Sequence, residues 1–132
     1  MKMIFQGVIC VLIALALLNL ATGLRAQNAD SNEPKEPEMT PSLNLGKMNY
    51  EAYCASCHGK TAAGTDRGPT FISKIYHPGH HGDGAFFIAA KRGVRAHHWR
   101  FGNMPPVKGV NDTQIQSILL YVRAVQQLNG VF

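Results

Sequence analysis

Cysteine is scarce in this chain of 132 residues, which contains three. Cys10 lies in an apolar N-terminal stretch, whereas Cys54 and Cys57 are separated by only two residues. A zinc site built on such a pair would require a second Cys pair, which the sequence does not contain. The small number of cysteines therefore excludes a zinc site at Cys54 and Cys57.

Alternation of apolar and polar residues, which is typical of half-buried β-strands, is also missing, and no internal repeat is visible. Helical periodicity and capping residues are present instead. The expected helices run from Ser42 or Asn44 toward Cys54, from an N-cap at Asp83 to Gly93, and from Asn111 or Asp112 to about Asn129. The Gly-rich and Pro-rich segments between them indicate loops. These patterns predict a mainly α fold with long loops.

The N-terminal residues 1–25 have the pattern of a secretory signal. Almost every position from Ile4 to Leu20 is apolar, and Lys2 precedes them. The small residues of Ala21-Thr22-Gly23 suit signal cleavage, while the alternative site after Ala26 follows a less suitable Leu24. We expect cleavage and a periplasmic or otherwise extracytoplasmic protein. An uncleaved N-terminal membrane anchor remains the alternative, because the stretch is near the lower length limit for crossing a bilayer.

Residues 26–42 lack aromatic side chains and are rich in proline and acidic residues. Such a composition cannot bury a hydrophobic core, so it predicts an extended, mobile spacer. The spacer separates the N-terminal segment from a folded domain over residues 43–132.

Acidic residues are few in the folded domain. From residue 44 onward the sequence has ten Lys and Arg residues against four Asp and Glu residues, a formal charge of plus six. A basic surface favours encounter with protein partners that have acidic docking surfaces. Nucleic acid is not expected as a partner, because the basic residues are dispersed along an exported chain.

The sequence Cys54-Ala-Ser-Cys57-His58 matches the C-x-x-C-H pattern of c-type haem attachment. One helical turn separates the two thiols enough for each to reach a vinyl group of the porphyrin, and His58 then projects under the iron. A redox dithiol would be expected to follow a strand and precede a helix, whereas here a helix precedes the motif and a Gly-rich loop follows it. The motif therefore predicts one covalent haem c with its iron on His58.

Met104 is the best-placed candidate for the sixth iron ligand. It lies in the loop Gly102-Asn103-Met104-Pro105-Pro106, far in sequence from His58, and could approach the opposite face of the haem. The other methionines lie in the N-terminal segment, in the spacer or in the helix before the haem motif. A thioether ligand raises the reduction potential of haem iron.

With these residues in place, the sequence resembles the class I monohaem cytochromes c over residues 43 to 130. The resemblance rests on the C-x-x-C-H motif and on Met104 followed by Pro105, with weaker support from Gly46, Tyr50 and Tyr121. It implies a small all-α cytochrome c fold of three to five helices with long loops around one haem. It also implies that the two terminal helices cross at a small residue packed against an aromatic side chain.

The resemblance suggests three further cofactor-binding residues. Gly68-Pro69 looks like the family element in which the proline carbonyl accepts a hydrogen bond from the proximal histidine, although it would otherwise be a simple turn. Phe71-Ile72 replaces the usual leucine after this proline. Trp99 and Arg100 lie where family members often bind a haem propionate, and packing is an equal alternative for Trp99.

Five histidines are unexplained by this scheme: His77, His80, His81, His97 and His98. One of them could replace Met104 as the sixth ligand, or the group could form a surface copper or zinc site. We favour solvated or hydrogen-bonded loop residues, because no fixed helical spacing holds the histidines together.

The leading functional hypothesis is a single-electron carrier with His58/Met104 ligation in an extracytoplasmic redox chain, and not an enzyme. The alternatives are a haem-based peroxidase or gas sensor with a labile distal ligand, and a tethered electron-transfer subunit of an exported oxidoreductase.

Overall fold

The computed structural model describes residues 33–132, so the predicted signal or anchor segment 1–25 lies outside the described residues. Four α-helices and a short 3-10 helix follow one another: α2 (Pro41–Tyr53), α3 (Ala55–His58), η2 (Lys74–Tyr76), α4 (Asp83–Arg92) and α5 (Asp112–Leu128). Within this part of the chain the only β pairing is one isolated bridge. None of the helices of residues 33–132 combines the length and the hydropathy that a membrane-spanning segment requires. The all-α expectation is confirmed.

Helices α2 and α5 begin at side-chain caps. The Thr40 hydroxyl accepts a hydrogen bond from the backbone N–H of Leu43, so the N-cap of α2 is Thr40 rather than Ser42 or Asn44. Asn111 caps α5 as predicted, and Gln114 completes a reciprocal capping box with it. Each cap satisfies backbone N–H groups that have no partner within their helix.

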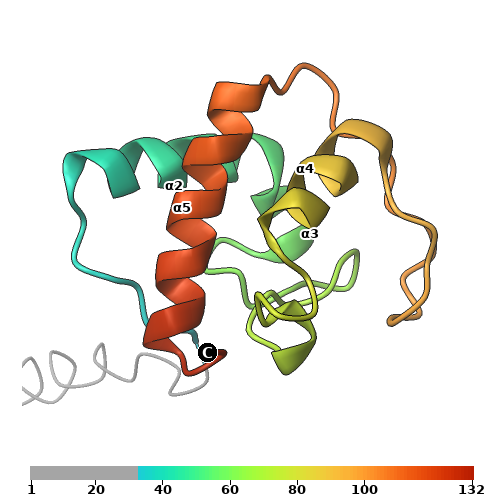
Figure 1. Cartoon of the computed structure of the whole chain (residues 1–132), viewed down its shortest axis with the longest axis horizontal. Coiled ribbons are helices and arrows are strands. Elements are labelled where there is room, and N and C mark those ends of the chain that lie inside the picture. Colours follow the sequence, from blue (N-terminus) through green and yellow to red (C-terminus); the bar gives the residue numbers. More distant parts are fainter. Residues whose placement is uncertain (1–32) are drawn as a thin grey trace, which may run out of the picture. The chain divides into compact units, whose positions relative to one another are not determined.

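The core lies where α2 crosses α5 (Figure 1). Tyr50 of α2 and Tyr121 of α5 are fully buried, and their ring centroids are 5.4 Å apart. Gly46 permits the close crossing, because a Cβ there would lie 2.3 Å from the backbone oxygen of Ser117. This is the small residue against an aromatic side chain that the resemblance implies.

The described residues at the end of the predicted spacer contact the folded unit. The Tyr121 hydroxyl donates a hydrogen bond to Glu36 at 2.6 Å, and Lys47 pairs with the same carboxylate at 2.8 Å. Burial alone would raise the pKa of Glu36, but these two partners together lower it below its usual value. Lys35 and Asn129 exchange two further hydrogen bonds. Composition did not predict these contacts.

Helix α4 leads into the loop that returns to Met104. The N-cap of α4 is Gly82, one residue before the predicted Asp83, and the helix ends at Gly93 as expected. Gly93 has a φ of +77°, and a Cβ there would lie 2.5 Å from the backbone oxygen of Met104. Val94 and Met104 then exchange backbone hydrogen bonds of 2.9 and 3.0 Å. The end of α4 therefore fixes the backbone of Met104.

Candidate haem-binding site

The C-x-x-C-H residues occupy the junction of α2 and α3. The Cys54 N–H donates to the Tyr50 carbonyl at 2.8 Å, which continues the hydrogen bonding of α2. Residues 55–58 form one helical turn, and the His58 N–H donates back to the Cys54 carbonyl at 3.0 Å. Cys54 and Cys57 are free thiols. The expected helical turn between the two thiols is present.

His58 is held through its Nδ1 atom, which lies 2.9 Å from the Pro69 carbonyl oxygen. A carbonyl can only accept, so Nδ1 carries the proton in this contact. Burial lowers the pKa of His58, partly opposed by the hydrogen bond to Pro69. The ring is thus favoured in its neutral form with Nε2 unprotonated, which is the form that binds iron. The histidine contact implied by Gly68-Pro69 is present.

Tight backbone packing brings Pro69 to His58. A Cβ on Gly68 would lie 2.9 Å from the Cys57 carbonyl oxygen, so only glycine fits there without movement. The Thr65 hydroxyl donates to the same carbonyl at 2.6 Å. The loop after the motif is therefore anchored on the motif itself.

Two aromatic side chains support this site. Phe71 stacks on the His58 ring with centroids 4.2 Å apart, and the Tyr50 hydroxyl donates to the Gly59 carbonyl at 2.7 Å. The sequence marks Phe71 only as a departure from a family leucine and does not reveal its contact with His58. Its position two residues after Pro69 was the available signal.

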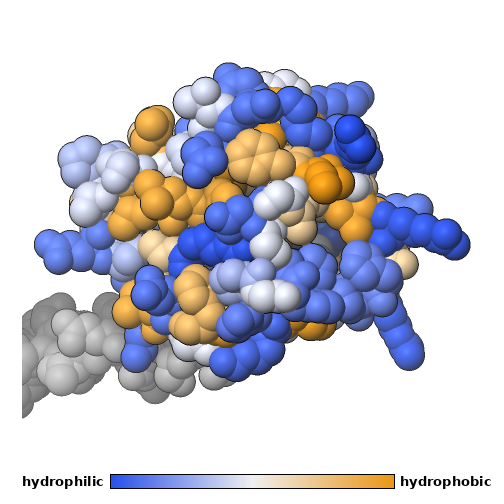
Figure 2. Space-filling model, viewed as in Figure 1, coloured by the Kyte–Doolittle hydropathy of each residue, from blue (hydrophilic) through white to orange (hydrophobic). Residues whose placement is uncertain are grey.

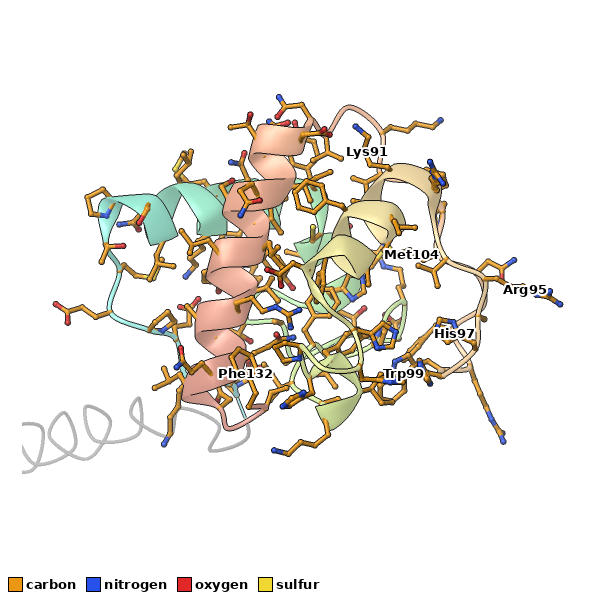
Figure 3. The ribbon with its side chains drawn as sticks, in the orientation of Figure 1. Lys91, Arg95, His97, Trp99, Met104 and Phe132 are labelled. Atoms are coloured by element: carbon orange, nitrogen blue, oxygen red, sulfur yellow. The ribbon has the colours of Figure 1, made fainter. Side chains whose placement is uncertain are left out.

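Met104 is half-buried, and its backbone is fixed by the bridge to Val94. Figure 3 shows Met104, Trp99 and His97 along the loop that follows α4. The side chain of Asn103 closes this loop by accepting from the Ala96 N–H at 2.9 Å. A thioether held on such a constrained backbone is suited to ligate a metal with little loss of conformational freedom.

Trp99 and Arg100 differ in their surroundings. Trp99 Nε1 is buried and has no hydrogen bond of normal geometry to any described residue. Burial raises the pKa of the Tyr76 hydroxyl, and the nearby Trp99 side chain partly opposes this rise. An indole N–H without a good partner suits an acceptor such as a haem propionate. Arg100 is exposed.

The chemistry of the donor set fits haem better than an ion or a redox dithiol. Among the described residues, the group whose ligand atoms converge closely enough for a metal ion consists of His80, His81 and His98, and includes neither cysteine. Burial and the neighbouring Cys57 raise the pKa of the Cys54 thiol to about 12, whereas a reactive dithiol needs a lowered pKa. Two free thiols and a neutral imidazole are the groups that covalent haem attachment uses.

Four of the five unexplained histidines gather in one cluster. The rings of His80, His81, His97 and His98 contact one another, with centroid distances from 4.2 to 5.9 Å. Desolvation and repulsion from the other three rings lower the pKa of His98. His77 lies apart from them against Phe132. The sequence shows these residues to be numerous but does not predict that two loops bring four of them together.

Arg123 of α5 positions one of these loops and was missed as a structural residue. Its guanidinium donates to the carbonyls of Tyr76 at 2.8 Å and His81 at 2.7 Å, and to the Asp83 carboxylate at 2.9 Å. It also lies 4.8 Å from the centre of the Phe86 ring. A basic residue on the apolar face of the last predicted helix was the signal for this role.

Comparison with known proteins gives one result for this chain. The family model described as cytochrome c matches residues 43–126. No curated protein and no solved structure matches. The match covers the helix crossing, the C-x-x-C-H motif, the His58 contact and the Met104 loop. The chain therefore belongs to the cytochrome c family, and is a c-type cytochrome that binds haem covalently and serves in electron transfer.

Proposed function

We propose that this protein is a single-electron carrier with one haem on Cys54 and Cys57, whose iron would be held by His58 Nε2 and Met104. The protein acts without an enzymatic activity of its own in an extracytoplasmic redox chain. Its haem supplies the chemistry by alternating between ferric and ferrous iron, one electron at a time. The protein groups around the haem set its reduction potential.

The observation that carries the proposal is the hydrogen bond from His58 Nδ1 to the Pro69 carbonyl at 2.9 Å. It fixes the ring orientation and directs the Nε2 lone pair away from the protein backbone. Such a contact makes an imidazole a stronger donor to a metal. The stacked Phe71 ring excludes water from one face of the imidazole.

The Met104 loop supports the second half of the proposal. Its backbone is held by two hydrogen bonds to Val94 and stiffened by the prolines that follow, which would limit movement of the thioether when the iron changes oxidation state. A ligand that stays bound to both ferric and ferrous iron keeps the reorganisation energy of electron transfer small. In the same arrangement Trp99 Nε1 would donate to a propionate, and the exposed Arg100 would supply a positive charge from the same loop.

The signal pattern of residues 1–25 supports export, with the soluble or tethered form depending on cleavage. The basic character of the folded part supports partners with acidic docking surfaces. Figure 2 shows hydrophilic side chains projecting from the side on which Figure 1 places the loop after α4. Arg95 and Arg100 are exposed in that loop.

Substitution of Met104 by alanine tests the axial ligand. The ferric haem-loaded protein is expected to show the weak red charge-transfer band of sulfur-ligated iron, and Met104→Ala is expected to lose it. The reduction potential of the variant should fall, because the thioether favours ferrous iron. Absorption spectroscopy and a redox titration measure both effects.

The matched control is Met48→Ala, because Met48 is 67% exposed on α2 and should leave band and potential unchanged. Retention of the band in Met104→Ala would refute methionine ligation at this residue. Rapid binding of CO by the unaltered ferrous protein would favour a gas-binding or peroxidase function instead.

A further inference from the structure

We propose that His80, His81 and His98 form a binding site for a divalent transition-metal ion, with Cu²⁺ preferred over Zn²⁺, separate from the haem iron. The ligand nitrogens of these three residues all lie within 4.8 Å of one another. They come from two loops, the turn before α4 and the loop before Met104. Imidazole is a ligand that both ions accept.

The spacing of the nitrogens suits one shared ion. His80 Nε2 and His98 Nε2 are 3.3 Å apart. Two nitrogens bound at about 2.0–2.1 Å to one ion are separated by roughly 2.9 Å at the right angle that Cu²⁺ prefers and by about 3.3 Å at the tetrahedral angle of Zn²⁺, so small ring movements reach either geometry. A small inward movement of His81 then completes a three-histidine set with an open position for water.

His81 has the second contact that metal-binding histidines typically make. Its Nδ1 lies 2.7 Å from the Ile75 carbonyl oxygen, so Nδ1 carries the proton and Nε2 is free to bind. Such a backbone contact fixes the tautomer and strengthens the ligand. The neighbouring His97 holds its Nδ1 2.8 Å from the Arg95 carbonyl in the same way, but it stands outside the converging set.

Both loops are anchored independently of any ion. The His81 carbonyl accepts from Arg123, and the backbone N–H groups of His80 and His81 donate to His77 at 2.8 and 2.9 Å. The bridge between Val94 and Met104 closes the base of the second loop. The histidines are therefore brought together by the fold, and His80 and His98 remain exposed to an incoming ion.

The charges around the set favour a soft or borderline ion over a hard one. The set contains no carboxylate, and the nearby Asp83 is already paired with Arg123. Hard ions such as Mg²⁺ require oxygen ligands. Among divalent ions of the first transition row, Cu²⁺ binds most strongly to a given nitrogen site. In Figure 3 the Arg95 side chain is directed away from His97, which limits repulsion of a cation.

Metal titration of the ferric, haem-loaded protein without a histidine tag tests the site. Equilibrium dialysis against Cu²⁺, Zn²⁺ and Mg²⁺, with glycine as a competing ligand, should give one Cu²⁺ per chain, weaker Zn²⁺ binding and no Mg²⁺ binding. His80→Ala and His98→Ala should each weaken Cu²⁺ binding by about tenfold or more. His77→Asn is the matched control, from the same loop but outside the set. Its amide oxygen can accept from the Gly79 N–H as His77 Nδ1 does at 2.9 Å, so the turn is kept and the variant should bind like the unaltered protein.

Electron paramagnetic resonance of the bound Cu²⁺ gives a second readout that does not depend on affinity. Nitrogen splitting from imidazole is expected, and it should be reduced in His98→Ala. Amide hydrogen exchange of residues 95–103 should slow when the ion is bound, because the ion joins the two loops. An unchanged haem spectrum shows that the variants remain folded.

Three outcomes would overturn the proposal. The first is the absence of stoichiometric binding. The second is equal binding by His80→Ala, His98→Ala and the unaltered protein. The third is an effect of His77→Asn as large as theirs. Tighter binding of Zn²⁺ with the same residue dependence would overturn the copper assignment.

Discussion

Gly46 is the residue on which the close contact between α2 and α5 depends. A Cβ at this position would lie 2.3 Å from the Ser117 carbonyl oxygen and 2.9 Å from the Tyr121 Cβ. The first of these neighbours is backbone and cannot rotate away. Any larger residue must therefore separate the helices that carry Tyr50 and Tyr121.

We expect Gly46→Ala to lower the free energy of unfolding by about 1–3 kcal/mol, the usual cost of overpacking a well-packed contact. Urea unfolding of the haem-loaded protein, followed by circular dichroism, measures the change.

Gly84→Ala is the matched control, since Gly84 lies in α4 with no atom within 4 Å of an added Cβ. It should raise stability by roughly 0.5–1 kcal/mol, because alanine loses less backbone entropy than glycine in a helix. Equal effects of the two substitutions would contradict the close crossing.

Helix α5 organises the loops as well as the core. One face buries Ile118, Val122 and Val125. From a neighbouring position Arg123 reaches the carbonyls of the loop before α4, with its own side chain only 13% exposed. Gln126, also fully buried, donates to the Phe71 carbonyl at 3.0 Å. The last helix therefore positions both the ring that stacks on His58 and the histidine turn.

Replacement of Arg123 by methionine should destabilise the protein by about 2 kcal/mol, because the carbonyls of Tyr76 and His81 lose the charge-assisted hydrogen bonds that Arg123 donates. Methionine keeps the apolar part of the side chain. Urea unfolding measures the loss, and amide exchange of residues 76–83 should increase.

Arg92→Met removes an equal charge from the exposed end of α4 and should change stability by no more than about 0.5 kcal/mol. If both variants lost the same stability, net charge rather than the hydrogen bonds of Arg123 would be responsible.

Positive charge characterises the molecule as a whole, with a formal net charge of +5 before haem is counted. Such a charge acts over about 8–10 Å at physiological ionic strength and affects association rates more than affinities. It therefore bears on which electron donors reach the haem quickly.

Reduction of the ferric protein by a small anionic reductant should become slower as salt is raised, while reduction by a small cationic reductant should become faster. Screening weakens attraction in the first case and repulsion in the second. Stopped-flow absorption at a series of ionic strengths measures both rates. A salt dependence of the same sign for both reductants would show that the field of the protein does not control encounter.

The sequence by itself determined the helical class, the capped start of α5, the haem motif and its histidine. These features depend on residues close together in the chain, where periodicity, capping and motif spacing act locally. The helix crossing at Gly46 and the Pro69 contact of His58 were predictable from resemblance, because each belongs to a short recognisable pattern.

The tertiary structure alone decided the contacts between distant residues. Glu36 joins the end of the predicted spacer to Tyr121, and Arg123 holds the histidine turn. The meeting of His80 and His81 with His98 depends on two loops whose approach is set by α4 and α5. No local sequence pattern predicts these long-range contacts, because the packing of helices and loops determines them rather than spacing along the chain.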